Sequence, residues 1–461
     1  MFAKTLVQRS STWSYHSLPR RPLSLTYLSL AARPAPFRQQ YTRSMATADG
    51  AAALKQSDVK QEAQHLANGS VPVNNNWSSP GPAAYDFRSM YPHISTTKAK
   101  DTLANPSLPP GDVVTTPTTR MLNAIASTTL LDDVFQDDPT TNDLEAFISD
   151  LTGKEAALLV LSGTMGNQVS IRTHLGAPPH SVVTDHRSHI LEWEAGGVAS
   201  LCGALVKPVT PSNGRYVTLE DVQKQTVLSD DIHACPTKLI SLENTLAGIV
   251  LPLDECRRIS RWARENGVLM HLDGARLWEA VAAGAGSLKE YCDCFDSVSL
   301  CFSKGLGAPI GSIIAGTKPF RERARWIRKS IGGGLRQAGV VTAAARVAVE
   351  DTFLGGMLQA SHERARQIAK MWEGYGGKTT NPVETNMVWF DLDAAGISTN
   401  DFIKEGEKVG LRLMGGRLVV HYQIGEDAVA RLEKLMQVVL KGGRTNGTAE
   451  HPLEKLQFPT E

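Results

Sequence analysis

The sequence predicts an α/β protein built around a largely parallel, doubly wound β-sheet. Between residues 156 and 315, short apolar runs that favour strands alternate with stretches that favour helices. Several of these runs end in small or polar residues, which is typical of a strand that leads into a tight turn. In a sheet wound in this way, functional side chains gather at the carboxyl ends of the strands.

The expected strands share a short apolar core, and they are Ala156–Leu161, Ser181–Thr184, Val206–Val209, Lys238–Leu242, Leu269–Leu272, Val298–Phe302 and Gly311–Ala315. Residues 253–266 are amphipathic and predict a helix that stops at Gly267. Thr118 or Thr119 can start a helix, and Pro139 precedes another. A long helix is expected over residues 340–372.

Composition limits the classes of function. The net charge of +1 gives no electrostatic basis for binding nucleic acid or an anionic membrane. No apolar run reaches the ~18–20 residues that a membrane span needs. The six cysteines lack disulfide or zinc spacing, so we expect reduced thiols and no metal site.

The chain termini differ in composition from the centre. Residues 1–45 have no acidic residue and several arginines, which predicts a mitochondrial transit peptide; an extension without targeting function is the alternative. Translation from Met45 would give a cytoplasmic form. Residues 46–84 predict a disordered linker. The expected domains are 85–345, a large domain with an N-terminal arm and an insertion at 90–111, and 346–441, a small C-terminal α+β domain with strands near 386–390 and 418–421, followed by a tail at 442–461.

A lysine follows one of the expected strands. Lys304 comes after Val298–Phe302 and is followed by small residues, so strand backbone would hold it in place. About thirty residues earlier, another strand ends at Asp273, with Arg276 close behind. An amine next to a carboxylate and a guanidinium suits a cofactor with an aldehyde and a ring nitrogen, which describes pyridoxal phosphate. Taken alone, a lysine in this position is far more often an ordinary surface lysine, so the other motifs decide.

A glycine-containing turn provides a possible anion site. Gly163 and Thr164 lie between an expected strand and an expected helix, where free N–H groups and the helix dipole favour a phosphate. With residues 243–244, 273–276 and 304, this turn makes four polar clusters at the carboxyl ends of strands. The sequence therefore predicts one shared site at that edge of the sheet.

From about Asp86 to Leu440, the chain resembles the low-specificity L-threonine aldolases, which are pyridoxal phosphate enzymes of fold type I, the aspartate aminotransferase fold. The resemblance rests on motifs that occur in a fixed order: Asp-Asp-Val-Phe-Gln-Asp-Asp-Pro-Thr (132–140), Ser-Gly-Thr-Met-Gly-Asn (162–167), His-Ile-Leu-Glu-Trp-Glu-Ala-Gly-Gly (189–197), Leu-Glu-Asn-Thr (242–245), His-Leu-Asp-Gly-Ala-Arg (271–276), Ser-Lys-Gly-Leu-Gly (303–307), Gly-Gly-Gly-Leu-Arg-Gln (332–337) and Arg-Leu-Val-Val-His (417–421).

The resemblance implies a role for each cofactor residue. Lys304 would hold pyridoxal phosphate through a Schiff base, and Asp273 would pair with its ring nitrogen. Gly163 and Thr164 would bind the phosphate. His189 would stack on the ring and move the proton of the substrate β-hydroxyl.

The resemblance also implies how the substrate is held. Ser89, Arg276 and Arg417 would clamp its carboxylate, and Arg276 would contact the cofactor as well. Arg336 would reach the phosphate region, either of its own subunit or of a neighbouring subunit in a homodimer or homotetramer.

The implied reaction is the cleavage of L-threonine, L-allo-threonine or a related β-hydroxy-α-amino acid to glycine and an aldehyde. A racemase acting on alanine with the same cofactor is the alternative enzyme, and a cofactor-binding scaffold without turnover is the alternative outside catalysis.

Three positions depart from the family pattern. Leu246 stands where the family usually has a histidine, which makes the aldehyde side of the site more apolar. Phe135 stands where a tyrosine is common. Residues 90–111 interrupt the segment that normally continues from Ser89, either as a true insertion or as retained intron sequence.

Overall fold

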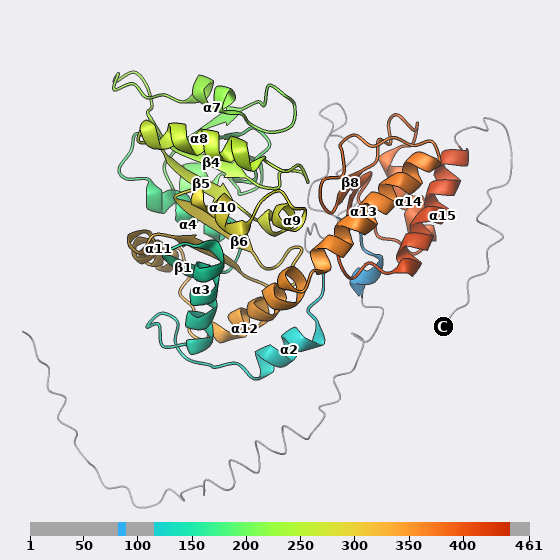
Figure 1. Ribbon diagram of the computed structural model, residues 1–461, viewed down its shortest axis with the longest axis horizontal. Helices are drawn as coiled ribbons and strands as arrows, with labels where there is room; N and C mark the ends of the chain where they lie inside the picture. Colours follow the sequence, from blue (N-terminus) through green and yellow to red (C-terminus); the bar gives the residue numbers. More distant parts are fainter. Residues whose placement is uncertain (1–81, 89–114, 443–461) are drawn as a thin grey trace, which may run out of the picture. The chain divides into compact units, whose positions relative to one another are not determined.

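A seven-stranded sheet is the central element of the computed structural model, which describes residues 82–88 and 115–442 (Figure 1). Its strands are β1 (Ala156–Val160), β2 (Ser181–Asp185), β3 (Leu205–Val209), β4 (Thr237–Glu243), β5 (Leu269–Asp273), β6 (Ser297–Cys301) and β7 (Ser312–Gly316). Their order is β1-β7-β6-β5-β4-β2-β3. Only β7 runs antiparallel to its neighbours, so the expected largely parallel sheet is confirmed.

All seven strands expected from the sequence are present, with ends displaced by no more than one residue. Both faces of the sheet are buried except at the edge strand β3, which is why the inner strands are largely apolar. Val183 and Ile240 pack into the largest hydrophobic cluster on one face. The preceding residues, Val182 and Leu239, pack into a separate cluster on the other face.

Helices cover both faces, as a doubly wound fold requires. The first face packs against α3 (Pro139–Thr152), α8 (Leu253–Glu265), α9 (Leu277–Ala282), α10 (Leu288–Asp293) and α12 (Gly339–Ala348). The opposite face packs against α4 (Gly163–His174), α5 (His189–Glu192), α6 (Gly197–Ser200) and α11 (Lys318–Ser330). The remaining helices of this part are α2 (Thr119–Ala126), which contacts α12, and α7 (Leu219–Gln225), which contacts β3 and α8.

Local sequence signals explain where the helices begin. The side chain of Thr118 accepts a hydrogen bond from the N–H of Met121 and so caps α2. Asp138 caps α3 in the same way, and Pro139 occupies the first helical position, where its missing N–H costs nothing.

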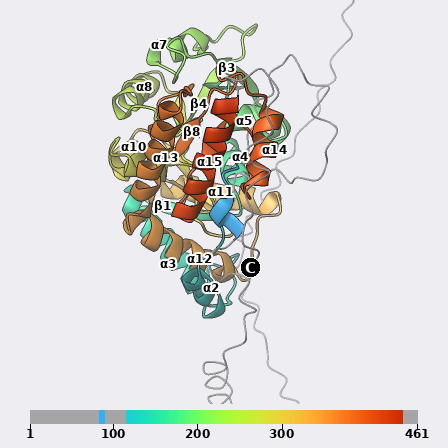
Figure 2. The same ribbon diagram turned by 90° about the vertical axis from the view of Figure 1, so that its right-hand side faces the viewer.

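A two-stranded antiparallel sheet forms the C-terminal part, with β8 (Met387–Trp389) and β9 (Arg417–Val419). Its helices are α13 (Met357–Gly374), α14 (Thr399–Lys408) and α15 (Glu426–Gly442), and α15 contacts the other two (Figure 2). A second hydrophobic core joins these elements. Phe87, which follows the short 3-10 helix η1 (Pro82–Tyr85), is buried in this core.

The long helix expected over residues 340–372 is interrupted. A π-helical turn, η3 (Val349–Leu354), follows α12, and α13 begins only at Met357. Gly356 has a φ of 78°, a left-handed conformation that glycine adopts without strain and that ends a helix. The consecutive glycines Gly355 and Gly356 are a helix-breaking signal at this point, and the expectation of one continuous helix gave them no weight.

Several expectations concern residues that the structure does not describe. These are the transit peptide, most of the linker, Ser89, the insertion at 90–111 and most of the tail. The domain boundaries stay predictions. All six cysteines are free thiols, as expected. Among the described helices, none is long and apolar enough to cross a membrane.

Candidate active site

The polar clusters expected at strand ends lie along one edge of the central sheet. Asp273 is the last residue of β5 and pairs in register with Glu243, the last residue of β4. Lys304 lies three residues beyond β6, and His189 begins α5, four residues beyond β2. Because these strands are parallel neighbours, their ends bring the four side chains to the same edge.

Lys304 lies in a tight turn. The N–H of Gly307 donates to the carbonyl of Lys304 at 2.9 Å, and the N–H of Ala308 donates to that of Phe302 at 3.0 Å. The φ of Gly307 is 84°, and a methyl group there would overlap the hydroxyl of Tyr422. The turn thus fixes the backbone that carries the amine. Lys304 is close enough to His189 for its positive charge to oppose the rise in the pKa of that histidine.

Asp273 is buried and receives two hydrogen bonds. The side-chain amide of Asn167 donates to one carboxylate oxygen at 2.7 Å, and the N–H of Ala275 donates to the other at 3.0 Å. Both donors stabilise a negative charge, and they fix the orientation of the carboxylate.

His189 is buried beside two acids. Its Nδ1 lies 2.8 Å from Glu194 Oε1, and its backbone N–H donates to Glu243 Oε2 at 2.9 Å. A ring nitrogen of His189 and carboxylate oxygens of Glu194 and Asp273 all lie within 4.8 Å of one another. Burial lowers the pKa of His189, but the hydrogen bond to Glu194 and the charges of Asp273 and Glu194 outweigh burial, so the pKa is raised overall.

The carboxyl group of Glu243 has a raised pKa. Burial, reinforced by the negative charge of Asp273, raises the pKa of Glu243 to about 8. The raised pKa favours the protonated form of Glu243 next to Asp273.

The turn at Gly163 and Thr164 forms the first turn of α4. Ser162 caps the helix by accepting from the N–H of Met165 at 3.1 Å. The first N–H groups of a helix have no acceptor within it and favour an anion. A methyl group at Gly163 would lie 2.8 Å from the sulfur of Cys301, at the end of β6, so glycine permits this close approach.

The two arginines come from different parts of the chain. Arg276 is buried immediately before α9, close enough to Cys301 to influence the pKa of its thiol. Arg417 is buried on β9, with its guanidinium carbon 5.1 Å from the ring centroid of Trp389. The indole N–H of Trp389 donates to the carbonyl of Ala247 at 3.0 Å. This contact ties the surroundings of Arg417 to the loop that follows β4.

Two expected site residues are not brought to this cluster by the described contacts. Ser89 lies outside the described residues, although the carbonyl of nearby Phe87 accepts from the N–H of Val419 at 3.2 Å. Arg336 instead pairs with Asp132 at 2.5 Å, and its side chain is 60% exposed.

Sequence reasoning gave no role to Asn167, Gln168 or Glu194, all of which are buried here. Gln168 donates to Glu194 at 2.5 Å and Asn167 donates to it at 2.8 Å. A usable signal was present, because two consecutive amide side chains near the start of a helix that packs on a sheet are unusual in an apolar core.

The side chains of this edge fit pyridoxal phosphate. Lys304 offers an amine for its aldehyde, Asp273 a buried acceptor for its ring nitrogen, and the start of α4 a cradle for its phosphate. The buried hydroxyls of Ser188 and Thr245, next to His189 and Asn244, have no hydrogen-bond partner within the described part of the chain. Such groups are normally satisfied by a ligand or water.

Fold and site together define a pyridoxal phosphate-dependent lyase of fold type I. The beta-eliminating lyase family matches residues 111–395, and the chain belongs to this family.

Three curated relatives are similar to most of the chain. Aldolase vrtJ of Penicillium aethiopicum is 58% identical over 385 residues, which are 84% of this chain and 92% of the relative. The low-specificity L-threonine aldolase of Candida albicans is 46% identical over 70% of this chain and 87% of its own length. Alanine racemase TOXG of Cochliobolus carbonum is 44% identical over 390 residues, 83% of this chain and 92% of the relative.

A solved structure also resembles the fold. The putative aromatic amino acid beta-eliminating lyase/threonine aldolase from Exiguobacterium sp. 255-15 has a TM-score of 0.58 and is 26% identical. The match covers 68% of this chain and 93% of that chain.

Proposed function

We propose that this lyase cleaves L-threonine, L-allo-threonine or a related β-hydroxy-α-amino acid to glycine and an aldehyde. The supporting observation is the grouping of Lys304, Asp273 and His189 at one edge of the sheet, with Glu194 against the histidine. That grouping offers an amine, a carboxylate and a base for one bound substrate.

Each residue has a distinct task in this proposal. Lys304 binds the cofactor aldehyde, Asp273 accepts from the ring nitrogen, and Gly163 and Thr164 bind the phosphate. Bound pyridoxal phosphate supplies an electron sink for the pair left at Cα. His189 faces the ring and takes the proton from the β-hydroxyl group.

The arginines decide which bond breaks. Arg276 and Arg417, with Ser89, hold the substrate carboxylate, and this fixes the orientation of the bonds at Cα. Loss of the hydroxyl proton to His189 lets the oxygen form a carbonyl as the Cα–Cβ bond breaks. The aldehyde departs, and a proton delivered to Cα completes glycine.

The surroundings of the loop after β4 favour an apolar substituent on the substrate. Met387, Trp389 and Val419 form a buried apolar cluster against which Ala247 packs. Leu246 is next in the chain to Ala247 and is half-buried. A larger apolar group at Cβ, as in phenylserine, would therefore be accepted at least as well as the methyl group of threonine.

Incubation with L-threonine, L-allo-threonine, phenylserine and L-alanine tests the proposal. Aldehyde and glycine in equal amounts from the hydroxy amino acids are expected, and Lys304→Ala should remove both the product and the borohydride-sensitive visible absorbance. Racemised alanine without aldehyde would instead favour the racemase reaction, for which the similarity to alanine racemase TOXG is the supporting observation.

A homodimer or homotetramer is part of the proposal. Three large apolar side chains are strongly exposed on neighbouring segments: Leu130 (61%), Phe135 (71%) and Trp326 on α11 (81%). A hydrogen bond shows that the segments are adjacent, since Arg325 donates to the carbonyl of Val134 at 3.0 Å.

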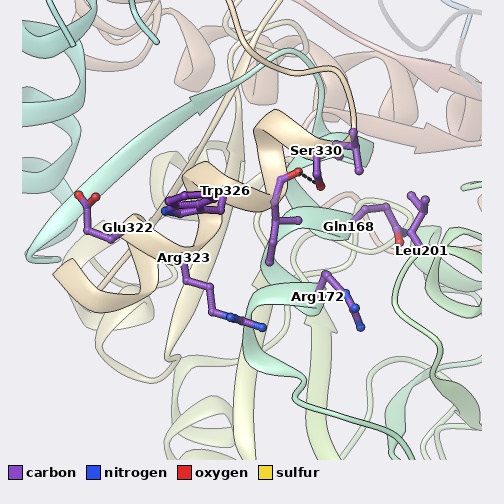
Figure 3. A pocket seen from close by; sticks show the side chains of 9 residues that line it. Gln168, Arg172, Leu201, Glu322, Arg323, Trp326 and Ser330 are labelled. Carbon is purple, nitrogen blue, oxygen red and sulfur yellow. Dashed lines mark hydrogen bonds between the residues drawn. The ribbon is translucent and has the colours of Figure 1, made fainter. Parts of the chain in front are cut away.

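A surface pocket of about 710 Å³ lies beside Trp326 and is lined also by Gln168, Arg172, Leu201 and Arg323 (Figure 3). An exposed apolar surface of this kind favours contact with a second copy.

Light scattering tests this surface. Trp326→Glu should lower the molar mass of the assembly to that of a smaller oligomer, because it introduces a charge into the proposed contact. Ile232→Glu is the matched control, since Ile232 is also strongly exposed but lies in the loop between α7 and β4, away from α11 in the chain. An unchanged mass for Trp326→Glu would oppose an interface there.

We also propose a mitochondrial location when residues 1–45 are used, and a cytoplasmic one when translation begins at Met45. Fluorescent fusions that begin at Met1 and at Met45 distinguish these outcomes. The proposed large domain is 85–345 and the proposed small domain is 346–441.

A further inference from the structure

The carboxylate of Glu194 receives three side-chain hydrogen bonds, two from α4 and one from α5. His189 Nδ1 lies 2.8 Å from Oε1, Asn167 Nδ2 lies 2.8 Å from the same oxygen, and Gln168 Nε2 lies 2.5 Å from Oε2. Glu194 is buried, so water does not compete strongly for these contacts. An ionised carboxylate can only accept, and each of the three neighbours must therefore donate.

Asn167 connects this carboxylate to Asp273. The same amide nitrogen donates to Asp273 Oδ2 at 2.7 Å, so its two N–H groups serve two carboxylates. The amide oxygen of Asn167 then faces His271 Nε2 at 3.2 Å, and this nitrogen must carry the proton.

The hydrogen-bond chain continues from His271 through Ser297 to His174. With Nε2 protonated, Nδ1 of the neutral ring accepts from the hydroxyl of Ser297 at 2.8 Å, and His174 Nε2 donates to that hydroxyl at 2.6 Å. Burial lowers the pKa of His271 to about 3 and that of His174 to about 4, so both rings stay neutral. Every donor in this chain therefore points toward Glu194 and Asp273.

We propose that Glu194 and Asn167 are positioning residues: Glu194 keeps the proton of neutral His189 on Nδ1, leaving the lone pair on Nε2, and Asn167 holds Glu194 and Asp273 in a fixed relation. The inference rests on the proposed function for the use of Nε2 as the base. Neither residue contacts the reacting atoms in this scheme. Together they determine which ring nitrogen of His189 can take the proton of the substrate hydroxyl. They also stabilise the positive charge that forms on the ring when His189 takes that proton.

A tight backbone turn follows Glu194. The backbone turn after it has Ala195 at φ 52° and Gly196 at φ 69°, and the N–H of Gly197 donates to the carbonyl of Glu194 at 2.9 Å. This turn directs the carboxylate back toward His189. Replacement by glutamine keeps the shape but offers one acceptor oxygen to three donors, so at least one contact is lost.

The first test measures the tautomer without any cofactor. Protein is prepared with nitrogen-labelled histidine, and the ring signals of His189 are identified by their absence in His189→Asn. The expected result above the pKa is a proton on Nδ1 in the wild type and a mixture of tautomers in Glu194→Gln. A proton on Nε2 of His189 in the wild type overturns the proposal, whatever reaction the enzyme catalyses.

The second test uses the pH profile of cleavage. Glu194→Gln should lower kcat by roughly 10- to 100-fold with a smaller change in KM, the range seen when the hydrogen-bond partner of a metal-ligating histidine is removed. Because Glu194 helps to raise the pKa of His189, its loss should also move the acidic limb of the kcat/KM profile to lower pH. An acidic limb that stays in place overturns the role of Glu194.

Two further variants separate positioning from structure. Asn167→Leu removes both donated hydrogen bonds, and the expected result is a loss of kcat with the wild-type tautomer of His189 partly lost. Glu145→Gln removes a buried carboxylate that accepts from the N–H of Leu159, far along the chain from His189, and should leave profile and tautomer unchanged. If Glu145→Gln shifts the acidic limb as Glu194→Gln does, the shift reports a general loss of a buried acid and the proposal fails.

Discussion

The side-chain amide of Gln423 makes two hydrogen bonds to the backbone of Thr116, accepting from its N–H at 2.9 Å and donating to its carbonyl at 2.9 Å. Four residues earlier in the same segment, the N–H of Val419 donates to the carbonyl of Phe87 at 3.2 Å. The chain on either side of residues 89–114 is therefore attached to one short stretch at the end of β9.

This arrangement predicts that residues 90–111 can be deleted. Six residues would remain between Phe87 and Thr116, and these reach roughly 20 Å when extended. Val419 and Gln423, their attachment points, are four residues apart and at most roughly 14 Å from each other. Shortening the connection should leave the fold intact and stabilise it by about 1–2 kcal/mol, because a shorter loop loses less entropy on closure.

Denaturant unfolding of the shortened and complete proteins, combined with cofactor absorbance, checks this expectation. A deletion extended through Pro117 is the control, since it also removes Thr116 and its contacts with Gln423. That longer deletion should destabilise the protein. A shortened protein that no longer folds or no longer binds cofactor would show that residues 90–111 are required.

Leu246 is expected to set the preference among substrates. Leu246→His places a polar, titratable ring next to Ala247, beside the cluster of Met387, Trp389 and Val419. The ratio of kcat/KM for L-threonine to that for phenylserine should rise by roughly tenfold, the scale on which an apolar pocket discriminates. Leu246→Met is the control, because it keeps the side chain apolar and should leave the ratio near its wild-type value. An equal ratio in all three proteins would exclude Leu246 from substrate selection.

The sequence predicted the central sheet well because most of its strands are short apolar runs buried on both faces, the edge strand β3 being the exception. For the same reason, Asp273 and Lys304 could be identified from their positions directly after such runs. The prediction that they share one edge needed only the rule for parallel strands, and the structure places them there.

The hydrogen bonds around His189 could not be predicted in the same way. Asn167 lies 27 residues from Glu194 and 106 residues from Asp273, so these contacts depend on how α4 packs over the sheet. No local propensity encodes such a distance. The break before α13 was missed for a different reason, because the prediction of one long helix gave no weight to the glycine pair Gly355-Gly356.

Gly307 and Tyr422 are predicted to be energetically coupled. Gly307→Ala adds a methyl group that overlaps the hydroxyl of Tyr422, at a φ of 84° that alanine adopts only with strain. We expect a loss of roughly 3 kcal/mol in the free energy of unfolding. Tyr422→Phe alone should stabilise by about 1 kcal/mol, because its buried hydroxyl has no hydrogen-bond partner among the described residues.

The double variant separates overlap from backbone strain. Removal of the hydroxyl relieves the overlap but not the strained φ, so the combined loss should be smaller than the sum of the two single effects by roughly 1 kcal/mol or more. Urea unfolding of all four proteins gives this coupling energy. Simple additivity would mean that the methyl group is accommodated without contact with Tyr422.

Glu243 is expected to make the cofactor-free protein less stable as the pH rises from about 4.5 to about 8. Burial, followed by the charge of Asp273, raises the pKa of Glu243 from 4.5 to about 8 in the folded state. Within this window the unfolded chain releases the proton while the folded protein keeps it, so the free energy of unfolding falls as the pH increases. Below the window both states are protonated, and above it both are ionised, so this contribution no longer changes.

Glu243→Gln should remove that dependence, because glutamine is neutral in both states. Its stability relative to the wild type is expected to increase steadily across the window, by an amount on the order of a few kcal/mol, and then to level off. Thermal and urea unfolding at several pH values, with cofactor absent, measure this difference. Glu145→Gln is an instructive comparison, since burial also raises the pKa of Glu145 but Arg321 lies beside it. Parallel stability curves for wild type and Glu243→Gln would mean that Glu243 is already ionised at neutral pH, and that the strand-end pair with Asp273 carries two negative charges.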